Sequence, residues 1–344
     1  MKLLIISNLY PPYVLGGYEI LCHQVSNELK ARGHQVVVLT STHGVEDGVE
    51  DGVQDDPSEN IHRVFKLYLP FTQKPRLLRH RRWLTGRYNY RVAEDFIKRE
   101  KPDLIFVWSQ LRLTVGSARA ALDSGIPTAF TFNDVHIGEF MPAHFNWAPR
   151  GLYRHIADHW VFPSITLKGI TLDHTTCISR RLKSNLMEYG MPIENSKIIY
   201  QGIPIERFPM KDDIGKIHSP VRALYVGQLH TYKGVHTFID AAHRIVREKG
   251  PKYLQVSIVG GGTEEYKSQL IKQVADGPAC IKFGGQIPHD ELPQVYRDND
   301  IFVFSSIWQE PFGLTHLEAM ASGTPVISTA DGGHGEFLED NVNS

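Results

Sequence analysis

Short apolar runs alternate along this chain with longer segments in which apolar residues recur every three or four positions. Turn-forming residues bound many of these runs, as is typical of buried strands in parallel sheets. The predicted strands are residues 3–6, 36–39, 103–108, 126–132, 175–179, 197–200, 221–226, 254–259, 301–304 and 326–328. Since helical segments separate the strands, the pattern predicts an α/β fold with parallel sheets.

Apolar stripes and terminating residues place the helices. One helix is expected to start near Tyr18, with an inward face of Ile20, Leu21, Val25 and Leu29. Another follows Gly234, with an inward face of Val235, Phe238, Ile239, Ala242 and Ile245. Further helices are expected at 113–122, 180–189 and 313–320. In open parallel sheets, ligands bind beyond the carboxyl ends of the strands, so the loops before these helices are candidate sites.

Two carboxylates mark the last strand–loop–helix unit, Glu310 in the loop and Glu318 about a turn and a half into the helix. A helix start suits a phosphate, because its free N–H groups and its dipole attract anions. Those N–H groups would belong to Phe312, Gly313, Leu314 and Thr315. A carboxylate further along can accept hydrogen bonds from the vicinal hydroxyls of a ribose. On spacing alone, a helix-capping acid and an exposed helical Glu explain the pair equally well.

Glycine-containing loops precede two other helices. Gly16 and Gly17 follow the first strand, and glycine lets a backbone approach a phosphate closely; a plain tight turn is the simpler interpretation. Between Gly227 and Gly234, Lys233 stands directly before a helix. An ammonium there can reach a diphosphate while the helix end adds its dipole. A surface lysine is the alternative.

Composition argues against some classes of function but does not identify one. A chain of 344 residues suggests two domains, expected at 1–202 and 220–344 with a connection at 203–219. The net charge of -1 gives no global sign of nucleic-acid binding. Three cysteines lie far apart without a C-x-x-C pair: Cys22, Cys177 and Cys280. This usage fits a reducing cytoplasm and not a zinc site, so we expect a cytoplasmic protein, at most bound to a membrane surface.

Residues 74–91 mix many Lys and Arg residues with Leu, Trp and Tyr. One interpretation is a solvated helix face with a few core contacts. The other is a basic amphipathic patch that contacts anionic lipid or a phosphorylated acceptor.

The segment EPFGLTHLEAMASGTPVI, which begins at Glu310, closely resembles the E-x7-E signature of the retaining glycosyltransferases of family 4, which have the GT-B fold. Glu310 and Glu318 stand at the spacing of that signature. The loop ending in Lys233 resembles the Gly-Arg-Leu…Lys-Gly loop of the family. Gly17 falls in a stretch similar to its glycine-rich first loop.

The resemblance implies two Rossmann-like domains with parallel sheets facing a central cleft. The second would hold a nucleotide-sugar donor and the first a glycan or lipid-linked acceptor, as in polysaccharide or glycoconjugate synthesis. The implied reaction is glycosyl transfer with retention of configuration, without a cofactor or metal. Glu310 would orient the sugar, Glu318 would bind the ribose, and Lys233 with Gln228 would stabilise the leaving diphosphate.

The chain departs from the family pattern at two positions. Gln228 replaces the usual Arg, and Asn133 occupies the usual place of a catalytic His. His136, three residues later, becomes the candidate, with a surface role as its alternative. The resemblance also implies further helices after the segment that ends at Glu336. Two rival functions stay open: an inactive sugar-nucleotide-binding protein and a GT-B sugar-nucleotide epimerase.

Overall fold

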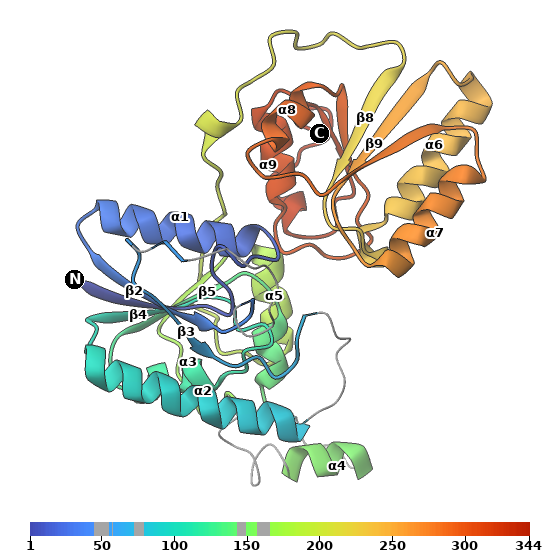
Figure 1. Cartoon of the computed structure of the whole chain (residues 1–344). Coiled ribbons are helices and arrows are strands. Elements are labelled where there is room, and N and C mark those ends of the chain that lie inside the picture. Colours follow the sequence, from blue (N-terminus) through green and yellow to red (C-terminus); the bar gives the residue numbers. More distant parts are fainter. Residues whose placement is uncertain (45–54, 57, 72–78, 143–148, 157–165) are drawn as a thin grey trace. The chain divides into compact units, whose positions relative to one another are not determined.

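In the computed structural model, the chain forms two compact units, Met1–Ile199 and Tyr200–Ser344 (Figure 1). The structure describes residues 1–44, 55–56, 58–71, 79–142, 149–156 and 166–344. Each unit contains one sheet whose neighbouring strands all run parallel. The predicted α/β fold with two parallel sheets is therefore confirmed.

The first unit has a seven-stranded sheet in the order β3-β2-β1-β4-β5-β6-β7. Its strands are β1 (Lys2–Ile6), β2 (Gln35–Ser41), β3 (Ile61–Phe65), β4 (Leu104–Val107), β5 (Thr128–Phe132), β6 (His174–Cys177) and β7 (Lys197–Ile198). Its helices are α1 (Gly17–Ala31), α2 (Arg79–Glu100), α3 (Gly116–Asp123), the 3-10 helix η1 (His136–Phe140), α4 (Pro149–Ile156) and α5 (Arg180–Glu188). Figure 1 shows α1 on one face of this sheet and α2 with α3 on the other.

The second unit has a five-stranded sheet in the order β10-β9-β8-β11-β12. Its strands are β8 (Val221–Val226), β9 (Leu254–Val259), β10 (Cys280–Gly285), β11 (Ile301–Phe304) and β12 (Val326–Ser328). Its helices are η4 (Ile205–Arg207), η5 (Thr231–Lys233), α6 (Val235–Lys249), α7 (Glu264–Ala275), α8 (Leu292–Arg297), α9 (Leu314–Ala321) and η6 (Gly333–Glu336). Helices α6 and α7 pack on one face through one apolar cluster, and α8 and α9 on the other through a second (Figure 1).

Two predicted apolar faces differ from the observed ones. In α1 the fully buried side chains are Glu19, Cys22 and Ser26, while the predicted apolar residues are only partly buried. In α6 the predicted inward residue Ile245 is 39% exposed, and His243 is buried instead. Both residues lie at edges of the apolar stripe. The side of α6 that carries His243 faces inward, because the Nδ1 atom of His243 accepts a hydrogen bond from Ala279 N–H at 3.2 Å.

The observed start of one helix differs from the predicted start because the backbone before it has an unusual conformation. The helix expected from 113 begins at Gly116, since Arg112 and Thr114 have φ angles of 61° and 72°, which a helix excludes. Strand β3 was not predicted, because four of its five residues are half-buried at the edge of the sheet and the run lacks a continuous apolar pattern.

Candidate functional site

The Lys233 loop is held in place by glycine. Gly234 separates η5 from α6 with a left-handed φ of 66°. A Cβ at this position would lie 1.9 Å from the carbonyl oxygen of Ser305, closer than any side chain permits. The loop therefore lies directly against the carboxyl end of β11, where the chain continues towards Glu310.

Lys233 and Glu310 form an ion pair at this strand end. The ammonium donates to Oε1 and Oε2 of the carboxylate at 2.7 and 2.8 Å. The Ser306 hydroxyl donates to Oε1 at 2.8 Å. The two charged side chains are only 16% and 8% exposed, so water screens the pair poorly. The two residues predicted to serve the leaving group and the transferred sugar thus bind each other in this structure.

Aromatic rings surround the Lys233 ammonium. Its Nζ lies 5.8 Å from the ring centroids of Tyr232 and Trp308, and 5.9 Å from that of Phe304. Cations are attracted to aromatic faces at such distances. Together with Glu310, these rings hold the ammonium in one position at the mouth of the loop.

The start of α9 has the geometry expected of an anion-binding helix end. Gly313 precedes the helix with φ 125°, and the next two residues, Leu314 and Thr315, begin the first turn, whose N–H groups have no partner within the helix. Phe312 is buried and stacks on Tyr200, with 5.8 Å between ring centroids. The stacking fixes the approach of the chain to the helix.

Glu318 is buried in α9, and each of its two carboxylate oxygens has a hydrogen-bond partner. Oε2 accepts a hydrogen bond of 2.8 Å from the Tyr296 hydroxyl, and Oε1 lies 3.1 Å from His289 Nε2. Burial raises the pKa of Tyr296, and the adjacent carboxylate raises it further, so the phenol stays a donor. A ribose that bound Glu318, as the resemblance implies, would have to share or displace these partners.

Two buried histidines stack beside this helix. The rings of His316 and His334 are 5.0 Å apart at 18°. Burial and, to a smaller extent, the neighbouring His334 lower the pKa of His316 to about 3. Burial also lowers the pKa of His334. Both rings are therefore neutral at physiological pH, and they pack as polar core residues behind the loop of Glu310.

In the first unit, the start of α1 and the end of β5 are tied together. The Tyr18 hydroxyl donates to the carbonyl oxygen of Asn133. Gly17 is exposed in the first turn of α1, and the Glu19 carboxylate accepts from the N–H of Gly16 at 3.0 Å. Burial raises the pKa of Glu19. Gly17, a predicted donor-binding residue, thus lies close to the segment that carries the candidate histidine.

His136 opens η1 and is held by charged neighbours. Its Nδ1 lies 3.2 Å from Glu139 Oε1, and Arg82 donates to Glu139 Oε2 at 3.0 Å. Burial alone would lower the pKa of His136, but the hydrogen bond to Glu139 and the charges of Glu139 and Asp134 raise it overall. The same contacts lower the pKa of Glu139 to about 2. These contacts therefore favour the imidazolium form more than in an ordinary histidine.

The predicted site residues fall into two groups. Lys233, Glu310 and the start of α9 lie at adjoining strand ends of the second unit, whereas Gly17 and His136 lie in the first. Gln228 is exposed in the loop after β8, and its carbonyl oxygen accepts from Tyr225 at 3.0 Å.

Sequence reasoning missed the partners of the predicted charges, which are Ser306, Tyr296, His289, Glu139 and Arg82. Tyr296 and His289 lie more than twenty residues before Glu318, and no pattern links them to it. Ser306, four residues before Glu310, and Glu139, three residues after His136, were close enough to be found by inspection.

The described residues contain neither a candidate metal cluster nor a candidate membrane-spanning helix. Within them, no group of three or more His, Cys, Asp and Glu side chains could hold a metal ion. No helix in the described ranges is both long and apolar enough to cross a bilayer. The basic segment 74–91 falls partly outside the described residues; from Arg79 onwards it forms the start of α2.

Two family models match the chain. Residues 15–207, more than half of the chain, match the model described as Glycosyltransferase Family 4. Residues 207–344 match the model described as Glycosyl transferases group 1.

Curated proteins and solved structures are also similar to this chain. A glycogen synthase from Mycobacterium tuberculosis is 28% identical over 351 residues, which cover 98% of this chain and 80% of the relative. An uncharacterised glycosyltransferase from Methanocaldococcus jannaschii is 26% identical over 365 residues, which cover 100% of this chain and 84% of the relative.

The crystal structure of Anabaena HepE in complex with UDP and glucose aligns with a TM-score of 0.67 at 22% identity, covering 100% of this chain and 84% of HepE. Sucrose-phosphate synthase from Thermosynechococcus elongatus aligns with a TM-score of 0.68 at 21% identity, covering 96% and 82%. At sequence identities this low, the structural similarity shows a shared fold and nothing more.

Proposed function

Because the chain belongs to glycosyltransferase family 4 and has the GT-B fold, we propose that it moves a sugar, with retention of configuration, from a nucleotide-sugar donor to a glycan or lipid-linked acceptor. The observation that carries the proposal is the Lys233–Glu310 ion pair beside the start of α9. The HepE structures in complex with UDP and UDP-glucose support a nucleotide-sugar as the donor class.

In the proposed reaction, the bond between the anomeric carbon and the diphosphate breaks, and the diphosphate leaves with the bonding electrons. Lys233 and the N–H groups of Gly313, Leu314 and Thr315 would stabilise the negative charge that grows on it. Entry of the diphosphate would draw the ammonium away from Glu310. The freed carboxylate would then accept a sugar hydroxyl or face the positive charge of an oxocarbenium-like transition state.

The acceptor hydroxyl would add to the same face of the sugar, with its proton passing to the leaving phosphate. Lys233 supplies the positive charge that a metal ion supplies in other transferases, so we propose a metal-independent reaction. Turnover in EDTA equal to turnover in Mg²⁺ would agree with this, and loss of turnover in EDTA would contradict it.

His136, whose pKa is raised by Glu139 and Asp134, is the candidate for a contact with the donor sugar from the first unit. An imidazolium donates from both nitrogens, so it can donate to a sugar hydroxyl while Glu139 occupies Nδ1. We expect His136→Ala to lower kcat more than nucleotide affinity. An unchanged kcat would assign His136 to the surface role.

The proposed site of action is the cytoplasmic face of a membrane that carries the acceptor lipid. On α2, Arg81, Arg87 and Arg91 are exposed together with Leu84 and Tyr88, a combination that suits an anionic bilayer surface. Sedimentation with vesicles containing anionic lipid at low salt tests this. Failure to sediment would remove the membrane contact and leave the donor site untouched.

A nucleotide-binding screen tests the central proposal. Thermal shift and calorimetry with UDP, ADP, GDP and their sugars are compared for the wild type, Lys233→Ala and Lys252→Ala. Lys252 is an exposed lysine of the same unit, so its variant controls for the lost charge. We expect one nucleotide to bind, with an affinity reduced about 10²-fold in Lys233→Ala (about 3 kcal/mol) and unchanged in Lys252→Ala. No nucleotide binding by folded wild-type protein would overturn the donor site.

Turnover separates the remaining alternatives. Donor hydrolysis or transfer, followed by NMR of the anomeric proton, identifies a retaining enzyme. A product of inverted configuration would refute retention. Binding without any turnover would favour the inactive binding protein, and conversion of the donor without an acceptor into an epimer would favour the epimerase.

A further inference from the structure

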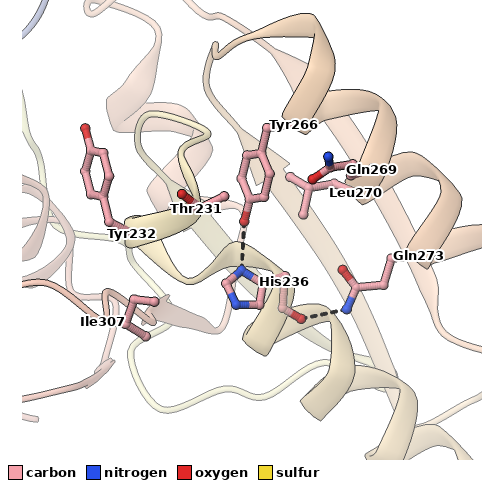
Figure 2. A pocket seen from close by; sticks show the side chains of 8 residues that line it. All are labelled: Thr231, Tyr232, His236, Tyr266, Gln269, Leu270, Gln273 and Ile307. Carbon is pink, nitrogen blue, oxygen red and sulfur yellow. Dashed lines mark hydrogen bonds between the residues drawn. The ribbon is translucent and has the colours of Figure 1, made fainter. Parts of the chain in front are cut away.

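A pocket lies beside the Lys233 loop, on the face of the sheet covered by α6 and α7. Its volume is about 540 Å³, within the range of about 300–1,000 Å³ typical of small-molecule sites. Figure 2 shows Tyr232 and Ile307 on one side of it and Gln269 and Gln273 on the other. Neither Lys233 nor Glu310 lines this pocket, so it is distinct from the proposed donor site.

The lining exposes more apolar than polar surface, and its polar side chains carry no fixed charge. It contains no Asp, Glu, Lys or Arg, and its polar members are Thr231, Tyr232, His236, Tyr266, Gln269 and Gln273. Amide and hydroxyl groups donate and accept hydrogen bonds, as sugar hydroxyls do. The tyrosine rings add apolar faces, which suit the C–H faces of a pyranose. Such a lining offers a phosphate or carboxylate no balancing charge, and it suits a neutral carbohydrate.

Several of these polar groups are available to a ligand. Among the described residues, the Thr231 and Tyr232 hydroxyls and the Gln269 amide have no hydrogen-bond partner. Other lining groups already have hydrogen-bond partners. The Tyr266 hydroxyl lies 2.9 Å from His236 Nδ1, and Gln273 Nε2 donates to the His236 carbonyl at 2.9 Å (Figure 2).

The pocket shares a wall with the proposed catalytic loop. The Tyr232 carbonyl accepts from Ile307 N–H at 2.9 Å and lies 3.2 Å from the Ser306 hydroxyl, which also donates to Glu310. A ligand seated against Tyr232 would therefore lie next to the residues that carry the proposed reaction.

We propose that this pocket binds a neutral sugar unit of the acceptor glycan or of its extended product, anchoring the chain near the reacting end. The inference rests on the proposed function, and it narrows the acceptor to one with neutral sugar residues near its growing end.

Ligand-observed NMR and calorimetry with maltotetraose, cellotetraose and mannotetraose test the pocket. Gln269→Trp fills it from α7 without touching the donor site. Ser268→Trp places the same bulk on the adjacent exposed position, outside the lining, and is the matched control. We expect at least one tetrasaccharide to bind the wild type, about tenfold weaker binding to Gln269→Trp (about 1.4 kcal/mol), and unchanged binding to Ser268→Trp.

Acceptor-free donor hydrolysis should be the same in all three proteins, while the KM for a glycan acceptor rises in Gln269→Trp alone. The inference is overturned if no tetrasaccharide binds the wild type, or if Gln269→Trp binds as well as Ser268→Trp. Failure of the proposed function looks different, since nucleotide binding and donor hydrolysis would then be absent while tetrasaccharide binding persisted.

Discussion

Both units place polar groups where β-strands end, but they hold their charges in different ways. In the second unit, the charges of Lys233 and Glu310 are largely buried and satisfied by each other. In the first, His136 and Glu139 are 43% and 38% exposed, and their charges are shared with Arg82 and with water. A buried pair fixes geometry and depends on both partners, whereas an exposed pair responds to pH with little effect on stability.

Breaking the buried pair should have the largest effect. We expect Lys233→Met to lower the free energy of unfolding by about 3–5 kcal/mol, because Glu310 is left charged and buried without its cation. Urea denaturation measures this. The double variant Lys233→Met/Glu310→Gln should recover most of the loss, since neither charge then remains. Equal stability of the single variant and the wild type would show that water solvates the pair.

Acid should destabilise the second unit through His316. Its folded pKa of about 3 lies below the unfolded value of 6.5, so between these pH values the unfolded chain binds the extra proton. Stability from this group is full above pH 6.5 and falls by about 1.4 kcal/mol per pH unit below it. Thermal unfolding from pH 7.5 to 5 measures the slope. His316→Gln should flatten it, and an unchanged slope would place the titration elsewhere.

Removing one donor to Glu318 should have a smaller effect. Tyr296→Phe leaves Oε2 of a buried carboxylate without its hydrogen bond, so we expect a loss of about 1–3 kcal/mol. Tyr253→Phe, at an exposed tyrosine of the same unit, is the control. Comparable midpoints of unfolding for the two variants would mean that Glu318 finds another donor.

The exposed pair of the first unit should barely change stability but should shift a titration. In Glu139→Gln, we expect the pKa of His136 to fall, because one of the two carboxylates that raise it is gone. The effect on unfolding should stay below about 1 kcal/mol. In the wild type, the contribution of His136 is lost as pH rises through its raised pKa, and that of Glu139 as pH falls from 4.5 towards 2. NMR titration of the imidazole tests both; an unchanged His136 pKa would assign its shift to Asp134.

Elements with strong local signals were predictable from the sequence. Apolar strands such as β8 and β11 cannot be exposed, and helix boundaries marked by glycine follow from backbone sterics. The spacing of Glu310 and Glu318 and the position of Lys233 before α6 also lie within short stretches. For these reasons the fold class and the charged residues of the candidate site could be predicted from the sequence.

Only the tertiary structure decided which groups these charges meet. Lys233 and Glu310 are 77 positions apart and become partners because Gly234 allows their loops to touch. Tyr296 meets Glu318 because α8 and α9 cover the same face of the sheet. Hydrophobic periodicity sets which side of an element is buried, but the partner of a buried polar group depends on which strand ends lie side by side. That arrangement is a property of the whole fold and of no single segment.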